Sequence, residues 1–132
     1  MGNDTFILTD EIISSGRKSI QKLVDNLICL KIDEIETYDF PKDQVFGLEI
    51  IYENALFYLI IRFSSKNKNF LCLAPSHFPR DKCDSNGDII NPPYFSRMKW
   101  VKSFDESIIV IDDPMKFIND NINVGWMIGE KK

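Results

Sequence analysis

The stretch VFGLEIIYENALFYLIIRF, residues 45–63, constrains the fold of this chain most strongly. Its two halves, Val45–Tyr52 and Ala55–Phe63, are rich in β-branched and aromatic residues. The polar pair Glu53-Asn54 separates them, a pattern typical of two strands joined by a tight turn. The second half is apolar at odd and even positions alike. We therefore expect it to be a central strand with both faces covered.

Further strand-length runs follow along the chain. Phe70–Ala74 comes after the polar stretch SSKNKN, so it and the two runs before it predict an antiparallel meander. Ser107–Ile111 is another compact apolar strand, and two shorter runs, Met98–Val101 and Val124–Ile128, are weaker candidates. Together these runs predict an antiparallel sheet of about five strands.

A helix is predicted near each end of the chain. Between Asp10 and Leu27, apolar or small residues recur at three- and four-residue spacing, which places them on one helix face: Ile13, Gly16, Ile20, Leu23, Val24 and Leu27. Thr9 or Asp10 is suited to cap this helix. In the alternative, Ile12 and Ile13 end a short strand and the helix begins at Ser14 or Ser15.

The second helix is predicted in the stretch DDPMKFINDN. Asp112 or Asp113 is a good N-cap, and Pro114 is suited to the first helical position. The predicted fold class is therefore α+β, an antiparallel sheet with an N-terminal helix and a short C-terminal helix packed on it.

Length and composition predict one soluble cytoplasmic domain over residues 1–132. No apolar run approaches the roughly 20 residues of a membrane span, and the first residues lack the basic region of a secretory signal. Three cysteines is an odd number, which argues against a disulfide scaffold. Cys29 and Cys72 lie in apolar runs, where a free thiol behaves as a small hydrophobe.

The charged residues are unevenly distributed. Seven acids against one base, Lys42, lie between Asp33 and Glu53. Such a block is either a solvated face or a field that attracts a basic partner. Of the aromatic residues in or beside it, we expect Phe40 and Tyr52 to pack in the core. The predicted partner-binding acidic face consists of Asp33, Glu34, Glu36, Tyr38, Asp39, Asp43 and Glu53.

Nucleic-acid binding is disfavoured. Eight bases against three acids lie between Arg62 and Lys102, but they are spread over the whole segment and a predicted buried strand interrupts them. The isoelectric point near 5.0 is far from the basic range expected of nucleic-acid-binding domains.

The segment Ala74–Phe95, APSHFPRDKCDSNGDIINPPYF, gathers the chain's single histidine, His77, with Cys83 and four of the six prolines. The paired clusters typical of structural zinc are missing, and counting from Gly87 puts Lys and Pro where a calcium loop needs acids. No nucleophile motif accompanies Cys83. We expect no metal or cofactor here, but a proline-stiffened loop whose apolar residues pack down or meet a partner: His77, Phe78, Tyr94 and Phe95.

In length, acidity, α+β build and lack of a catalytic motif, the chain resembles the small immunity proteins that neutralise bacterial toxins. The resemblance extends over the whole chain and involves no specific motif, so it transfers no functional residues. It implies a non-enzymatic protein that binds a cognate toxin, such as a basic toxin domain. Two alternatives remain. One is a small enzyme or ligand-binding domain with a site under the 74–95 loop, and the other is a structural domain that oligomerises through a sheet edge.

Overall fold

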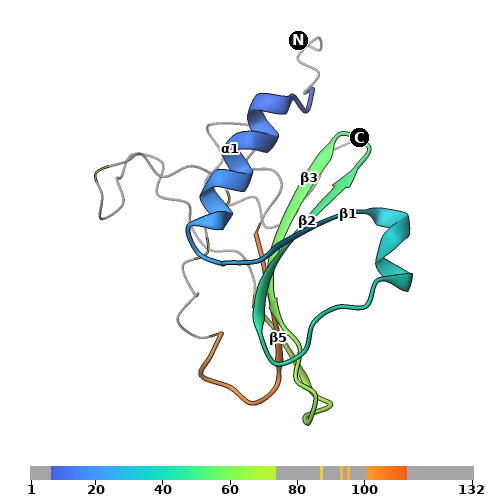
Figure 1. Cartoon of the computed structure of the whole chain (residues 1–132), viewed down its shortest axis with the longest axis vertical. Coiled ribbons are helices and arrows are strands. Elements are labelled where there is room, and N and C mark those ends of the chain that lie inside the picture. The colour runs from blue at the N-terminus through green and yellow to red at the C-terminus, as the bar shows by residue number, and fades with distance from the viewer. Residues whose placement is uncertain (1–6, 74–86, 88–92, 94, 96–100, 113–132) are drawn as a thin grey trace.

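The structure, a computed structural model, describes residues 7–73, 87, 93, 95 and 101–112. These residues form an α+β fold in which a helix lies against one face of a five-stranded sheet (Figure 1). The elements in chain order are α1 (Asp10–Gln21), β1 (Leu27–Lys31), the 3₁₀ helix η1 (Ile32–Thr37), β2 (Val45–Tyr52), β3 (Ala55–Arg62), β4 (Phe70–Leu73) and β5 (Ser107–Ile111).

The sheet is mixed, so the prediction of a wholly antiparallel sheet was wrong. Its strand order is β1-β2-β3-β5-β4; β1 runs parallel to β2, and β4 runs parallel to β5. The predicted hairpin of β2 and β3 is confirmed, with register from Val45↔Arg62 to Tyr52↔Ala55. Glu53 in its turn has φ 53°, the left-handed conformation that suits two-residue hairpin turns.

The predicted meander was also wrong, because β5 lies between β3 and β4. The burial of the two strands explains this order. β5 is buried or half-buried at every position, whereas β4 alternates between exposed and half-buried residues. The more apolar strand takes the inner place beside β3, and the more exposed strand is the last in the sheet order of the described residues.

The predicted start of the N-terminal helix is confirmed, but the predicted helix was too long. Thr9 caps α1, because its Oγ1 accepts a hydrogen bond from the N–H of Ile12 at 3.3 Å. The alternative start at Ser14 or Ser15 is therefore wrong. The helix ends at Gln21 rather than Leu27, and Leu27 begins β1, an element the sequence analysis missed. Val24 and Leu27 fit the helical spacing but follow the end of α1. Both side chains pack in the same core as the helix, which is why the spacing predicted a longer helix.

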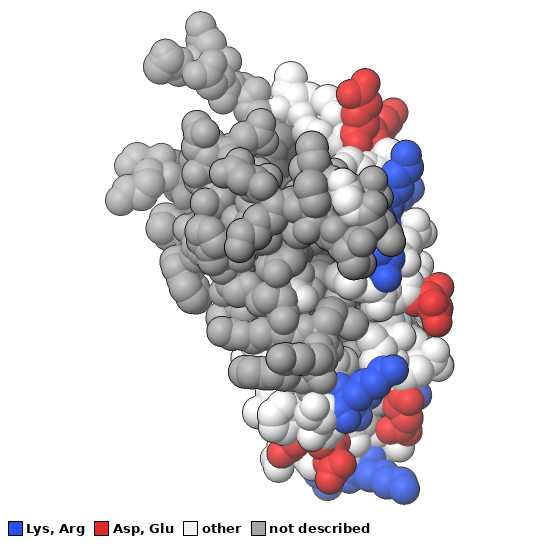
Figure 2. All heavy atoms as spheres, turned by 90° about the vertical axis from the view of Figure 1, so that its left-hand side faces the viewer, with Lys and Arg blue, Asp and Glu red and all other residues white. Residues whose placement is uncertain are grey.

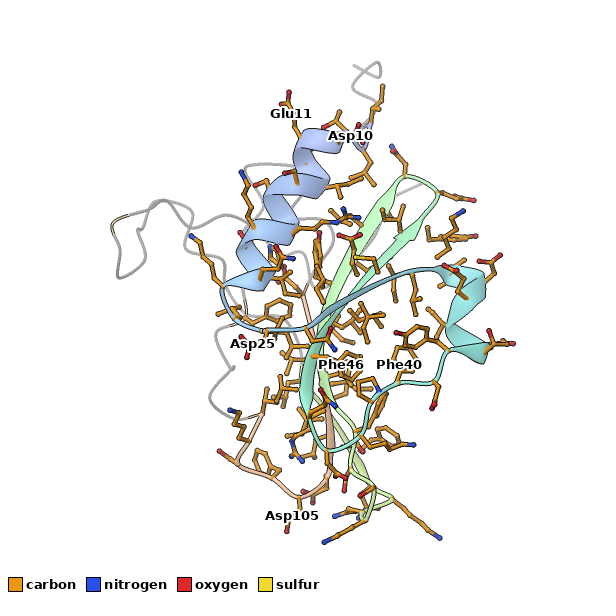
Figure 3. All side chains as sticks on the ribbon, in the orientation of Figure 1. Asp10, Glu11, Asp25, Phe40, Phe46 and Asp105 are labelled. Atoms are coloured by element: carbon orange, nitrogen blue, oxygen red, sulfur yellow. The ribbon has the colours of Figure 1, made fainter. Side chains whose placement is uncertain are left out.

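β3 is the central strand, as predicted, and apolar side chains lie on both of its faces. On one face, α1 covers the core that includes Tyr58 and Ile60. On the other face, η1 and the segment after it supply Ile35 and Phe40 to a second core around Phe46. The rings of Phe40 and Phe46 stack with centroids 5.7 Å apart (Figure 3). Core packing is thus confirmed for Phe40.

Several expectations concern residues outside these cores. Tyr52 is 47% exposed, so its predicted core role was wrong. Cys29 and Cys72 are free thiols and both are exposed, so the apolar runs around them do not place them in the core. Each of these residues belongs to an apolar strand. Tyr52 is the last residue of β2, and Cys29 and Cys72 lie in β1 and β4, the outer strands of the sheet. Among the described residues, neither helix is long and apolar enough to cross a membrane.

The remaining predictions fall largely outside the described residues. This holds for the C-terminal helix after Asp112, the strand at 124–128, and most of the short run at 98–101, of which Val101 is described as a buried turn residue. Of the predicted loop patch, Phe95 is described and packs in the core on the α1 side of the sheet. His77, Phe78 and Tyr94, together with Cys83, lie outside the described residues.

Arg62 fastens the 101–106 segment to the end of β3. Its Nε donates to the carbonyl of Val101 at 3.0 Å, and its Nη2 donates to the carbonyls of Phe104 and of Glu106, the latter at 3.2 Å. We expect Arg62→Met to lower the free energy of unfolding by about 1–2 kcal/mol, because these carbonyls lose a charged donor. Urea unfolding measures this change, and amide exchange in residues 101–106 should accelerate. Lys66→Met, at an exposed loop position, is the control and should change neither; equal effects of the two variants would contradict this role of Arg62.

Candidate functional site

A groove of about 540 Å³ lies on the α1 side of the sheet, beside the helix. α1 packs over β2 and β3, where its residues Gly16 and Ile20 approach Tyr58 and Gly47. Among the described residues, α1 does not extend over the ends of β1 and β2, which line the groove. Because the two strands are parallel, their carboxyl ends meet at the same end of the sheet. The groove is lined by residues of all three elements and of the segments that follow β1 and β2, among them Arg17, Cys29, Lys31, Asp33, Glu49 and Glu53.

An ion pair between exposed Arg17 and buried Glu49 lines this groove. Glu49, in the middle of β2, has its side chain 1% exposed and binds Arg17 of α1 through two hydrogen bonds: Nε to Oε2 at 2.9 Å and Nη2 to Oε1 at 2.8 Å. The hydroxyl of Tyr58 donates to Oε2 of Glu49 at 2.6 Å. Sheet register brings these groups together, since Glu49 lies opposite Tyr58 in β3 and opposite Cys29 in β1.

The protonation states in this cluster are shifted in consistent directions. Burial alone would raise the pKa of Glu49, but the hydrogen bonds from Arg17 and Tyr58 outweigh it and hold that pKa below its ordinary value. Burial, and then the hydrogen bond to Glu49, raise the pKa of Tyr58. Partial desolvation and the neighbouring carboxylate raise the pKa of the Cys29 thiol. All three pKa values move away from neutrality, so the cluster is suited to a fixed ion pair rather than to acid–base chemistry at pH 7.

The predicted acidic face is divided by the fold. Asp33 and Glu34 in η1 and Glu53 in the hairpin turn all line the groove. Glu36 and Asp39 are exposed on and just after the same 3₁₀ helix. Tyr38 and Tyr52 add aromatic surface there, with 40% and 47% of each residue exposed.

Asp43 lies elsewhere, just before β2. Its N–H donates to the carbonyl of Phe63, and its carboxylate accepts hydrogen bonds from the hydroxyl and the N–H of Ser65. These bonds to Ser65 lower the pKa of Asp43. Asp43, with φ 59°, lies in a bend at the opposite end of β2 from Glu53. Its described contacts are structural, and the acidic surface we consider below leaves it out.

Charges of both signs are mixed among the described residues that Figure 2 shows. In Figure 2, which faces the side of the molecule on the left of Figure 1, the acidic and basic side chains of the described residues alternate along the rim. Two further hollows, of about 340 and 540 Å³, lie at the far end of the sheet. One is lined by residues of the β3–β4 loop and the other by residues 23–26, Asp43 and Lys102.

Sequence reasoning missed Arg17, Glu49 and Tyr58 as a unit. One signal was available: Glu49 is the single charge within VFGLEIIY, a strand that otherwise reads as buried. A buried carboxylate needs a cationic or hydrogen-bonding partner. The identity of that partner depends on how α1 docks, which the local pattern does not contain. No group of three metal-ligating side chains is found among the residues that the structure describes.

No protein-family model matches the chain, and searches of curated proteins and of solved structures likewise give no match.

Proposed function

We propose that this chain is a non-enzymatic binding protein whose acidic face engages a basic protein partner. The acidic face is defined here as Asp33, Glu34, Glu36, Tyr38, Asp39, Tyr52 and Glu53. The observation that supports this proposal most directly is that Asp33 and Glu34 of η1 line one groove with Glu53 of the hairpin turn. The other acids of the face and both tyrosines are exposed. Tyrosine is enriched at interfaces because its ring offers contact area and its hydroxyl can bond.

The charge balance of this surface is consistent with a basic partner. Glu49 is buried and neutralised by Arg17, so neither group adds a net charge to the face. The exposed acids remain, with Lys31 as the nearest opposing charge among the groove residues. Complementary charge accelerates encounter and makes binding weaken with salt.

The more specific proposal is that the partner is a bacterial toxin domain and that this chain is its immunity protein. The resemblance in length, acidity and α+β build supports it. The enzymatic alternative depends on His77 and Cys83, which lie outside the described residues.

Charge reversal of Glu34, Glu36 and Asp39 to lysine tests the proposal. We expect the triple variant to bind the partner at least about tenfold more weakly than the wild type, because attraction is replaced by repulsion. Tagged wild-type and variant chains would capture partners from the native cell, and affinity for the captured protein would be measured at low and high salt.

The matched control reverses three other exposed acids, Glu11, Asp25 and Asp105, which lie away from η1 (Figure 3). It has the same net charge as the triple variant, so it separates a local contact from a general charge effect. A partner that binds both variants and the wild type with equal affinity would show that the acidic face is not the interface.

A further inference from the structure

β1 has one unpaired edge within the described part of the chain. It is the first strand in the sheet order, and it pairs with β2 alone. The N–H of Gly47 donates to the carbonyl of Asn26 at 2.8 Å, which sets the phase of the parallel ladder. Ile28 and Leu30 then direct their peptide groups toward β2, whereas Leu27, Cys29 and Lys31 direct theirs to the open side.

Part of this edge is already closed. The outward N–H of Lys31 donates to Oε1 of Glu34 at 2.7 Å. This bond ends the edge where η1 begins, a common way in which proteins protect an edge strand. The peptide groups of Leu27 and Cys29 remain on the open side, so the edge can accept a short added strand.

The groove continues from this edge on the α1 side. Cys29 and Lys31 lie in register with Glu49 and Ile51 and share their face of the sheet. Side chains of a strand added beside β1 would alternate in the same way, so every second one would point to the groove side. Ile32 and Ile51 supply apolar lining, and the groove volume of about 540 Å³ falls within the usual range for ligand pockets.

The charge of the groove selects the side chain that would enter it. Arg17 neutralises Glu49, which leaves Asp33, Glu34 and Glu53 against Lys31. A lysine or arginine side chain matches this arrangement, because its stem covers apolar lining while its head meets carboxylates.

We infer that the groove docks an extended basic segment of the partner, which pairs with the β1 edge at Leu27 and Cys29 and inserts one lysine or arginine between Asp33 and Glu53. This inference rests on the proposed function and specifies its mode of recognition. Strand addition supplies affinity through main-chain hydrogen bonds, and the groove supplies specificity.

The test uses the full chain and three libraries of capped hexapeptides. Five positions of each hexapeptide carry randomised β-forming residues, and the third position is fixed as Lys in one library, Glu in the second and Leu in the third. At peptide concentrations up to about 1 mM, the chain should retain the Lys library about tenfold more strongly than the Glu library. Backbone N-methylation of the selected peptides should abolish binding, and NMR shifts should map to β1 and the groove. Equal retention of the three libraries, no retention of any, or shifts confined to other elements would overturn the inference.

Two pairs of variants localise the effect. Asp33→Asn with Glu53→Gln should remove the preference for lysine, whereas Glu11→Gln with Asp105→Asn should keep it. Cys29→Pro removes an N–H that β2 does not use, so the edge strand should tolerate it, and Cys29→Val keeps that N–H. We expect the proline variant to lose about tenfold or more in peptide affinity and the valine variant to retain it. If the proline variant fails to fold, the N-methylated peptides provide the same test.

The same variants separate this inference from the proposed function. If the native partner binds Cys29→Pro normally but loses affinity for the Glu34, Glu36 and Asp39 reversal, the acidic face stands and the docking mode is wrong. If neither Cys29→Pro nor the charge reversal changes the affinity for the partner, both the acidic face and the docking mode are wrong. A concentration-dependent dimer in sedimentation that Cys29→Pro dissociates would assign the edge to a second copy of this chain and would also overturn the inference.

Discussion

Replacement of Arg17 with alanine is expected to lower the free energy of unfolding by roughly 2–4 kcal/mol at neutral pH. The variant leaves the Glu49 carboxylate, 1% exposed, without its counterion. Loss of one partner from a buried pair typically costs about 3–5 kcal/mol. We place the value lower because Arg17 is itself 45% exposed, so water already reaches its side of the pair. Urea unfolding at pH 7 would measure the change.

This cost should shrink as the pH falls. In the wild type, the folded pKa of Glu49 lies below its ordinary value of 4.5, so the ionised carboxylate stabilises the fold above that pH, and its contribution is lost as the pH falls through the folded pKa. In the variant, the buried carboxylate lacks a counterion and its pKa rises, so protonation at lower pH removes the unfavourable buried charge. The stability difference between the two proteins should therefore narrow between about pH 7 and about pH 4.

Lys18→Ala is the matched control, because it removes an exposed cation from the next position of the same helix. Its effect should stay within about 0.5 kcal/mol at all pH values. An Arg17→Ala variant as stable as this control, or one whose deficit does not change with pH, would show that Glu49 does not depend on Arg17.

Replacement of Gly16 with valine should lower the free energy of unfolding by roughly 2–3 kcal/mol, the upper part of the range for overpacking. A Cβ atom at this position would lie 2.7 Å from Cε2 of Tyr58 and 2.8 Å from its hydroxyl oxygen. The ring cannot easily move, since it is buried and its hydroxyl is bound to Glu49. We therefore expect α1 to shift away from the sheet, which thermal and urea unfolding would detect.

A graded series makes this prediction specific. Gly16→Ala should fall between the wild type and Gly16→Val, although alanine at an exposed helix position would be about 1 kcal/mol better than glycine. Ser15→Val, at an exposed neighbouring position, is the control for the effect of valine on the helix itself. Stabilisation by Gly16→Ala would mean that the approach of α1 to Tyr58 is looser than the structure shows.

The sequence predicted those elements whose side-chain pattern is uniform. The β2–β3 hairpin was predicted with its register-defining turn, because two β-branched runs flank a two-residue polar turn. The start of α1 and the bounds of β5 were also found, since a capping threonine and a compact apolar run are local signals. β1 was missed because LICLK is too short for its period to distinguish strand from helix.

The candidate site was predictable in part. The residues between Asp33 and Glu53 are acidic in sequence, and most of their exposed side chains do gather around η1 and the hairpin turn. The sequence did not show that Glu49 is withdrawn from that surface or that Asp43 lies at the far end of β2. Both outcomes depend on pairing partners, Arg17 and Ser65, that are distant along the chain.

The sequence by itself determined an N-terminal helix followed by strand-forming segments, a central strand covered on both faces, and an acidic segment facing solvent. These properties follow from side-chain chemistry and local period. The tertiary structure alone decided the strand order, the parallel pairing of β1 with β2, and the groove at their carboxyl ends. These features arise from contacts between residues far apart in sequence, such as Arg17 with Glu49 and Gly16 with Tyr58. No local pattern encodes such contacts, because each depends on where the fold places a residue that is distant along the chain.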